Sequence, residues 1–514
     1  MNIFRVSALA ACAAFGVLTV VPLNSQSQLS GRERTGEVGA PIVLGLPPAV
    51  ALERPDTTGV AMTLPSVWVE DPTTGGMYRR DHVLVRFRET ASASLRTTAL
   101  ANAGASGTSA RLWDGWERAA VDAEATVETV SAKLANDPAV SDVLLDYRVD
   151  ATATRPNDEF FSRQWNFEAI DLPRTWDIND GGSDQIIVAV VDSGLNVEGG
   201  VFTFRGTAVG TVSLAFAEAA DLIRPGGIVG AFDLVYGDDV PLDFSGHGTH
   251  VAGTIAQVTG NGAGAAGIAH KVRLMPLKVL SGPMDAVLNP GNMGGADSTV
   301  AAGIRRASDR GAHVINLSLG APSPQVMTRD AIAYAVSRGA FVAIAAGNDG
   351  DGRNPVEYPA SYGAQIEGAV TVGAVGRDLR RASYSGFKNY LEICAPGGDD
   401  TRDEADSQNG ISQMTYRSGN SWSGLSALQI FANFTRGQRP RYDTFMVTAR
   451  QGTSMAAPHV AGVAALLYSQ GLRNPAAVER VIKQFARPLN ATADECGAGL
   501  VDPRGAMRGM GLLQ

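Results

Sequence analysis

The chain has 514 residues, of which 45% are hydrophobic and 18% are charged, and its formal net charge is −9 at neutral pH. This length allows two or three domains, and the apolar content is typical of a globular protein with a large core. The charge is spread along the chain and forms no basic stripe, so we expect no nucleic-acid partner.

The N-terminal residues are typical of an exported protein. Arg5 precedes an apolar run over residues 6–21, which is short for a membrane-spanning helix and fits a secretory signal. We predict a signal peptide at residues 1–27 and a secreted, extracellular protein. A lipoprotein box ending in Cys12 is less favoured, because the apolar run continues beyond it. Residues 28–79 are rich in Pro, Gly, Thr and Ser and predict a linker or disordered leader.

Residues 80–152 predict a small α+β unit that precedes the main domain. Residues 82–87 and 143–147 have the apolar content of strands. Residues 92–104 and 124–136 are expected to be helices, the second with apolar side chains at helical spacing.

The larger C-terminal part, residues 153–514, predicts an α/β domain. Helical patterns alternate with short, fully apolar strand patterns, which is the signature of parallel crossover units. We expect three layers, with a mostly parallel sheet between helices. The clearest alternation gives helices at 298–310 and 328–338 and strands at 314–319 and 340–346.

Ser454 is the candidate nucleophile. It follows Gly452 and precedes a predicted amphipathic helix at residues 455–469. Unpaired backbone N–H groups and the positive end of the helix favour negative charge there, as attack on a carbonyl requires. The alternative is that the serine only caps the helix.

Two further segments supply a base and an acid. The apolar run at residues 185–191 predicts a buried strand, and Asp192 falls at its carboxyl end, where open α/β sheets place ligands. His247 lies between glycines before an alanine-rich helical stretch. Serine needs a base to accept its proton, histidine titrates near neutrality, and a carboxylate orients the imidazole.

These three segments, in the order Asp, His, Ser, resemble the subtilisin-type serine peptidases (subtilases), close to the thermitase and proteinase K branches. The resemblance covers roughly residues 155–510. It implies that Asp192, His247 and Ser454 form a catalytic triad. It also implies that Asn348, which ends an Ala-Ala-Gly-Asn segment, donates to the oxyanion. Asn348 and His247 argue against the sedolisin group, which uses an aspartate and a glutamate at these positions.

The resemblance implies a serine endopeptidase that cleaves protein or peptide substrates through an acyl-enzyme, and we expect a monomer. A non-catalytic scaffold with the same fold is disfavoured, because all four catalytic positions are retained. A nucleotide-binding domain is disfavoured, because no glycine fingerprint follows a strand.

Six residues are expected to bind substrate. In the family, the end of one strand pairs with the extended substrate backbone, and Glu357 corresponds to a position near the floor of the primary specificity pocket. A carboxylate there would attract Lys or Arg before the scissile bond; the alternative is a solvent-facing loop residue. The expected substrate-binding residues are Ser318, Leu319, Gly320, Ala346, Gly347 and Glu357.

Residues 257–267 resemble the loop that holds a strong calcium site in thermitase-like members. The family's second aspartate lies in a His-Pro-Asp motif soon after the triad aspartate. That motif is missing here, and Glu198 is the candidate substitute. Because calcium takes six to eight oxygens, the set is incomplete, and a metal-free Gly-rich loop is the alternative. The expected ligands are the carboxylate of Asp158, the amide oxygen of Asn261 and the backbone carbonyls of Val258, Ala263 and Ala265.

The same resemblance identifies residues 80–152 as an inhibitory propeptide with a ferredoxin-like fold, removed by self-cleavage around residues 150–155. Residues 399–448 exceed the usual family spacing and are interpreted as a surface insertion of unknown role. We expect no C-terminal module. Cys394 and Cys496 remain after the signal, either as a disulfide or as two buried thiols.

Overall fold

The computed structural model describes seven stretches of the chain, which form two compact units divided at residue 153. The predicted signal peptide and almost all of the predicted processing window lie outside these stretches. The described residues are 68–70, 77–112, 114–147, 155–219, 221–290, 294–400 and 409–510.

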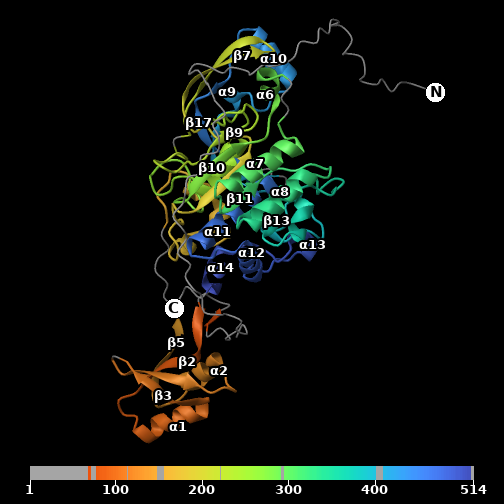
Figure 1. Ribbon diagram of the computed structural model, residues 1–514. Coiled ribbons are helices and arrows are strands. Elements are labelled where there is room, and N and C mark those ends of the chain that lie inside the picture. Colours follow the sequence, from red (N-terminus) through yellow and green to blue (C-terminus); the bar gives the residue numbers. More distant parts are fainter. Residues whose placement is uncertain are drawn as a thin grey trace, which may run out of the picture. The chain divides into compact units, whose positions relative to one another are not determined.

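The smaller unit has the β-α-β-β-α-β order of the expected ferredoxin-like fold (Figure 1). Its antiparallel strands lie in the order β3-β4-β2-β5, with β1 paired to one end of β2. Side chains of Ser92 and Thr126 accept hydrogen bonds from the first turns of α1 and α2, which fixes where both helices begin. The elements are β1 (Trp68–Glu70), β2 (Met77–Phe87), α1 (Ala93–Ala103), β3 (Ala105–Arg111), β4 (Trp116–Val121), α2 (Val127–Ala135) and β5 (Val140–Tyr147).

Both predicted helices and both predicted strands of this unit are confirmed, but the sheet is larger than expected. The start of β2 and all of β1 lie inside residues 28–79, which the sequence indicated as a linker. Neither β3 nor β4 was predicted, and the sequence of β3 consists of small and polar residues without an apolar alternation. Pairing with β4 makes it a strand.

The larger unit contains a seven-stranded, wholly parallel sheet in the order β14-β13-β12-β11-β6-β10-β9. The central strands are buried on both faces, as their continuous apolar runs require. The strands are β6 (Ile187–Asp192), β9 (Phe232–Asp233), β10 (Arg273–Lys278), β11 (Val314–Leu317), β12 (Phe341–Ala345), β13 (Ala369–Val375) and β14 (Ile393–Pro396).

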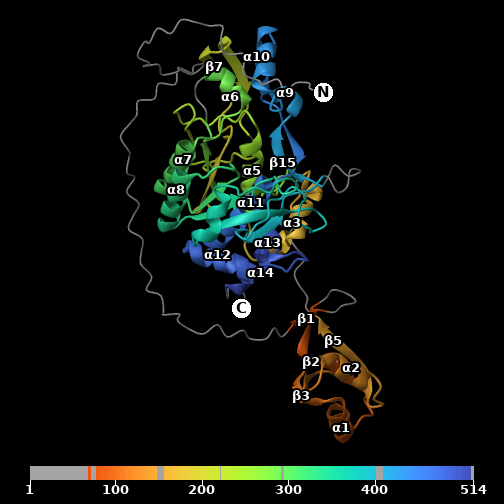
Figure 2. The same cartoon turned by 90° about the vertical axis from the view of Figure 1, so that its right-hand side faces the viewer.

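Helices cover both faces of this sheet, which confirms the three-layer α/β prediction (Figures 1 and 2). Val188 and Val190 of β6 pack into the cluster that includes α5 (His247–Ala256) and α11 (Thr453–Ser469). Ala189 and Val191 pack on the other face, with α7 (Asp297–Asp309) and α8 (Val326–Ser337). The remaining helices of these layers are α3 (Trp165–Ala169), α4 (Leu172–Trp176), α12 (Pro475–Gln484), α13 (Ala493–Cys496) and α14 (Pro503–Gly509).

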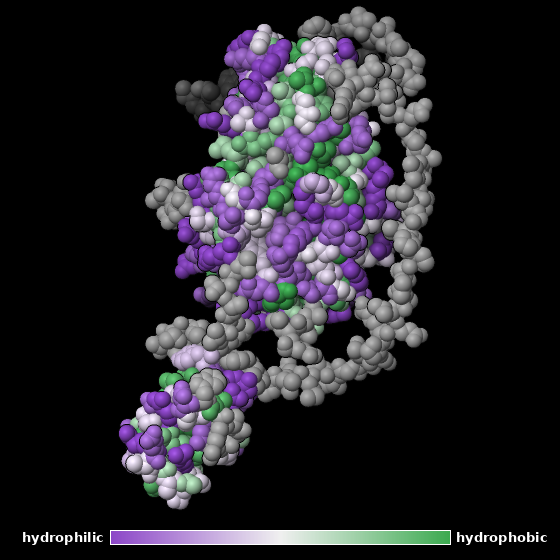
Figure 3. All heavy atoms as spheres, turned by 90° about the vertical axis from the view of Figure 1, so that its left-hand side faces the viewer, coloured by the Kyte–Doolittle hydropathy of each residue, from purple (hydrophilic) through white to green (hydrophobic). Residues whose placement is uncertain are grey.

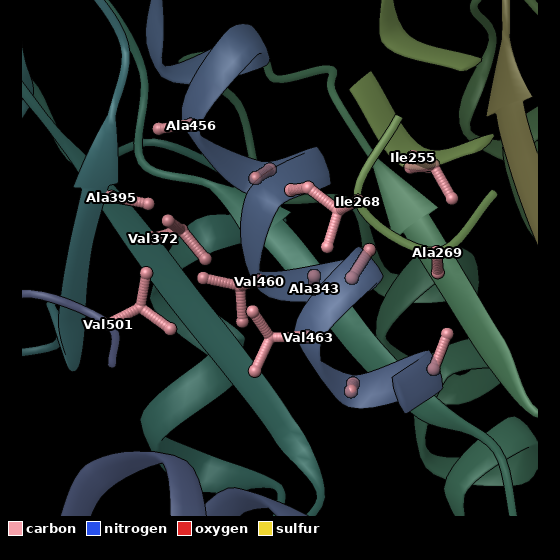
Figure 4. Packing of buried hydrophobic residues seen from close by; sticks show 14 of the residues in the cluster. Ile255, Ile268, Ala269, Ala343, Val372, Ala395, Ala456, Val460, Val463 and Val501 are labelled. Carbon is pink, nitrogen blue, oxygen red and sulfur yellow. The ribbon is translucent and has the colours of Figure 1, made fainter. Parts of the chain in front are cut away.

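Helix α11 is the centre of the main core. Val460 and Val463 lie among Ala343 of β12, Val372 of β13 and Ala395 of β14 (Figure 4). The helix is buried on all sides, so its N-terminus is held rigidly against the carboxyl ends of the strands.

A disulfide joins Cys394 in β14 to Cys496 in α13, with their Cα atoms 5.0 Å apart. Of the two alternatives left open by the sequence, the bridge is therefore the one observed. It attaches the C-terminal segment to an edge strand of the parallel sheet.

A third hydrophobic cluster, rich in aromatic rings, lies beyond the parallel sheet. We call residues 200–216, 283–288 and 417–442 the aromatic lobe; its elements gather at one end of the unit (Figures 1 and 2). Tyr442 is fully buried and stacks on Phe216 with ring centroids 4.8 Å apart. The elements are β7 (Gly200–Thr207), β8 (Gly210–Phe216), α6 (Pro283–Leu288), α9 (Ser418–Ser421), α10 (Ala427–Thr435) and β16 (Arg441–Tyr442).

The described part of the segment interpreted as a surface insertion, residues 409–448, is thus folded, and it shares this hydrophobic cluster with β7, β8 and α6. It leaves and rejoins the main domain through an antiparallel pair, β15 (Ile411–Tyr416) and β17 (Phe445–Arg450). Apolar side chains reach the surface on this side of the unit (Figure 3), and β7 and β17 carry the exposed Val201 and Met446.

Within the described ranges, no helix has the length and apolar character needed to cross a bilayer.

Candidate active site

Asp192 and His247 form a hydrogen-bonded pair at the carboxyl edge of the sheet. Asp192 is the last residue of β6 and is fully buried, and His247 is the first residue of α5. His247 Nδ1 lies 2.7 Å from Asp192 Oδ1, which also accepts the N–H of Ser193 at 2.6 Å. This bond places the hydrogen on Nδ1 and leaves Nε2 as the acceptor of the neutral ring.

The surroundings of His247 raise its pKa. Burial alone would lower the pKa of His247, but the Asp192 carboxylate outweighs burial and raises it above its usual value. Arg450, at the end of β17, opposes this increase through its positive charge. The neighbouring His250 is fully buried, and its pKa is lowered to about 3 by burial and by Arg450.

Ser454 lies in the first turn of α11, where backbone N–H groups are not used within the helix. Gly452, which precedes this turn, has φ +147°, a conformation that L side chains rarely adopt. The Ser454 hydroxyl donates to the carbonyl oxygen of Ser318 at 3.4 Å, and the Ser318 hydroxyl donates to the carbonyl oxygen of Ser454 at 2.8 Å. The helix start is therefore attached to the residue that follows β11.

Asn348 follows β12 and is exposed. Its Oδ1 accepts the backbone N–H of Thr453 at 2.9 Å and the Thr453 hydroxyl at 3.0 Å. Because both donors occupy the oxygen, the amide NH₂ is the end left for a substrate oxygen. This amide therefore lies next to the backbone N–H of Ser454, as an oxyanion site requires.

Asp243 is a site residue that the sequence analysis missed. It is fully buried, and its two oxygens accept the N–H groups of Ser245, Gly246 and Thr249 around the start of α5. The N-cap residue Gly246 has no side chain, so Asp243 satisfies the helix N-terminus instead. An acidic residue shortly before a glycine-capped helix is the signal that could have revealed it.

The predicted substrate-binding residues fall into two neighbouring segments. Ser318, Leu319 and Gly320 follow β11, which ends two residues earlier than predicted because Ser318 turns to bond with Ser454. Leu319 and Gly320 make no main-chain hydrogen bond to another described residue, so their edge is free to pair with an extended peptide.

The second segment, Ala346 and Gly347, follows β12, and Glu357 packs against it. A Cβ added to Gly347 would lie 2.4 Å from Glu357 Cγ, and one added to Gly320 would lie 3.3 Å from Glu357 Oε2. The carboxylate therefore lies between the two segments and is only 8% exposed. Burial, and then Asp349, raise the pKa of Glu357. No cation in the described part of the chain forms an ion pair with it.

The loop at residues 257–267 gathers two acidic side chains. Asp158 Oδ2 accepts the N–H of Gly260 at 2.7 Å, while its Oδ1 is buried without a hydrogen-bond partner. Asp221 Oδ1 accepts from the Asn261 amide at 2.8 Å. Burial raises the pKa of Asp221, and the charge of Asp158 adds to this increase. No hydrogen bond from the described residues reaches the backbone oxygens of Val258, Ala263 and Ala265.

Two carboxylates, one amide and three carbonyls are hard-oxygen groups of the kind that calcium binds, and the unpaired Asp158 oxygen fits such an ion. The Asn261 oxygen also accepts the N–H of Ala263 at 2.9 Å, which leaves it one lone pair for a metal. The sequence named Glu198 as the substitute for the family's second aspartate; the carboxylate that lies beside Asn261 is that of Asp221. Among the described residues, no group of three or more His, Cys, Asp or Glu side chains could hold a metal ion.

Comparison with known proteins gives a consistent result. Residues 183–499 match the family model that is described as "Subtilase family". The chain is 31% identical over 423 residues to the thermophilic serine proteinase of Bacillus sp. (strain AK1), covering 81% of this chain and 84% of that protein. It is 32% identical over 348 residues to thermitase of Thermoactinomyces vulgaris, covering 68% and 97%.

Among solved structures, a protease from Pseudoalteromonas arctica PAMC 21717 is similar, with a TM-score of 0.53 and 30% identity. The match covers 69% of this chain and 99% of that one. The chain described here therefore belongs to the subtilase family. It is a serine-type endopeptidase, and its substrates are proteins or peptides.

Proposed function

We propose that Ser454 is the nucleophile, His247 the general base and Asp192 the orienting acid of this endopeptidase. The observation that carries the proposal is the 2.7 Å bond between His247 Nδ1 and Asp192 Oδ1, with Nε2 left as acceptor. Ser454 is attached to the residue after β11, and β11 is the neighbour of β6, the strand that ends in Asp192. All three side chains thus belong to one edge of the sheet.

Each step of the reaction has a residue assigned to it. The Ser454 hydroxyl turns from the Ser318 carbonyl to His247 Nε2, gives up its proton there, and its oxygen bonds to the substrate carbonyl carbon. The Asn348 amide and the Ser454 N–H bind the oxyanion. His247 returns the proton to the nitrogen as the C–N bond breaks, and water then hydrolyses the ester by the same route.

A fluorophosphonate probe tests this assignment. We expect it to label the wild-type protein on Ser454, to fail with Ser454→Ala, and to react far more slowly with His247→Ala. Ser421→Ala, which changes a serine of the aromatic lobe, is the control and should label normally. Labelling that persists in Ser454→Ala, or full peptidase activity of that variant, would contradict the proposal.

The protein is also proposed to be a self-processing zymogen, with residues 80–152 as its intramolecular inhibitor. The support is a separately folded ferredoxin-like unit that precedes the peptidase. N-terminal sequencing of the mature protein should give a start within residues 150–155, and Ser454→Ala should remain uncut. A start beyond residue 165 would exclude this site.

Glu357 is proposed to select Lys or Arg before the scissile bond. Its carboxylate lies between Gly320 and Gly347, in the two segments expected to bind the extended substrate. It has no cationic partner among the described residues. A buried, unpaired acid is stabilised by a cation that binds beside it.

A structural calcium ion is proposed in the loop at residues 257–267. Asp158, Asp221 and Asn261 would hold it with the carbonyls of Val258, Ala263 and Ala265. Its chemistry there would be to neutralise two buried carboxylates and to tie residue 158 to the loop. We further propose, from the apolar run at residues 6–21, that the protein is secreted; we expect it to act as a monomer.

A further inference from the structure

A buried lysine lies directly behind the Asp192–His247 pair. Lys278 is the last residue of β10 and is the register partner of Asp192 on the neighbouring strand. Its side chain is only 1% exposed, and its ammonium group lies 5.0 Å from the centroid of the Phe244 ring. A charge in such surroundings must be matched by fixed polar groups.

The ammonium group of Lys278 donates to the carbonyl oxygen of Ser193 at 3.1 Å. Ser193 in turn contacts both catalytic elements. Its N–H donates to Asp192 Oδ1 at 2.6 Å, and its hydroxyl accepts the N–H of Gly248, next to His247, at 2.9 Å. The same hydroxyl donates to Asp243 at 3.0 Å. One residue therefore fixes the carboxylate rotamer and the start of α5, and Lys278 fixes that residue.

The counter-ion comes from the aromatic lobe. Asp285 of α6 lies 3.2 Å from the Lys278 ammonium group, and its other oxygen caps α6 by accepting the N–H of Gly282 at 2.7 Å. Asp233 is also buried near Lys278, and burial raises its pKa to about 8. Among the described residues, Asp285 is the acid that forms an ion pair with Lys278.

Helix α6 is itself held by the segment between β15 and β17. Met284, Val287 and Leu288 of α6 pack in the cluster that includes Ile430 and Phe434 of α10. The chain of contacts runs from α10 through α6 and Asp285 to Lys278, Ser193 and Asp192.

We infer that Lys278 is a positioning residue for the Asp192–His247 pair, and that Asp285 of the aromatic lobe holds it in place. The inference rests on the proposed triad. It assigns the aromatic lobe a role in catalysis, because the lobe supplies the counter-ion that keeps a cation beside Ser193.

Four variants of the full chain test this. Lys278→Met should lower kcat about tenfold or more with KM little changed, since one charge-assisted hydrogen bond is lost behind the reacting groups. Lys278→Arg should restore part of kcat. Lys278→Met with Asp285→Asn removes both charges but keeps the α6 cap, so it should fold and still show the low kcat. Lys483→Met removes a more exposed lysine of α12, which forms ion pairs with Glu392 and Glu479, and should change Tm without changing kcat.

The proton NMR signal of His247 Nδ1–H, recorded in a Ser454→Ala background, gives a second readout that general destabilisation would not move. It should shift in the double variant and stay in place in Lys483→Met. Wild-type kcat and an unmoved signal in the folded double variant would overturn the inference. If the wild-type protein itself fails to react with a fluorophosphonate, the proposed triad fails instead, so the two failures are distinguishable.

Discussion

The backbone N–H of Thr453 donates to Asn348 Oδ1 at 2.9 Å, and the Thr453 hydroxyl donates to the same oxygen at 3.0 Å. Two donors from the residue before Ser454 therefore decide which end of the Asn348 amide faces the substrate. The oxyanion site and the nucleophile are built as one unit, since both depend on the first turn of α11.

This relationship predicts different effects for two substitutions. Asn348→Ala should lower kcat by about 10²–10³, the usual effect of losing an oxyanion donor, with little change in KM. Thr453→Val removes one of the two donors to Oδ1 and should give a smaller loss in kcat. Steady-state kinetics on one peptide measures both. A kcat for Asn348→Ala within threefold of wild type would show that Asn348 is not the oxyanion donor.

Arg450 is expected to set the acidic side of the pH profile. Its positive charge lowers the pKa of His247, against the larger opposing effect of Asp192. Activity needs neutral His247 and is lost as pH falls through its pKa. Arg450→Met should therefore raise that pKa and move the acidic limb of kcat/KM to higher pH. Arg436→Met, an exposed arginine in the aromatic lobe, should leave the limb unchanged. If the acidic limb of Arg450→Met moved to lower pH, Arg450 would not lower the pKa of His247 as proposed.

Glu357 should confer a preference for Lys and Arg that depends on pH. We expect the wild-type enzyme to cleave after Lys or Arg about 10–100-fold better than after Leu, and Glu357→Gln to lose this difference. Because the pKa of Glu357 is raised, the preference should disappear as pH falls, starting at higher pH than for an ordinary glutamate. Cleavage-site profiling of a peptide library measures it. A clean preference for Phe or Leu in the wild type would exclude the idea.

The calcium proposal predicts that the effect of Asp221→Asn on Tm differs between protein in chelator and protein with calcium. Charged Asp221 is unfavourable without a cation, because its pKa is raised by burial and by Asp158. In chelator, Asp221→Asn should melt no lower than wild type; with calcium it should melt lower, because it loses a ligand. Glu198→Gln is the matched control and should follow wild type in both conditions. A wild-type Tm unaffected by chelator would count against the site.

The position of Asp221 explains why the sequence did not reveal it. The family's second aspartate lies close after the triad aspartate, which is Asp192 in this chain. Instead, the hairpin of β7 and β8 intervenes between them in sequence. Gly200 pairs with Phe216, so the two ends of the hairpin meet and the chain resumes its course beyond it. Spacing in the sequence does not reveal Asp221, because antiparallel pairing of β7 and β8 brings the two ends of a long insertion together in space.

The sequence by itself determined the parallel α/β architecture and the candidate catalytic residues. Buried strands and glycine-flanked helix starts are local patterns, and Asp192, His247 and Ser454 each lie at the end of one such element. Only the tertiary structure decided that Asp243 caps α5, that Cys394 bonds to Cys496, and that Lys278 meets Asp285. These contacts join residues that no periodicity relates, and buried charges and polar groups take the partners that packing brings to them.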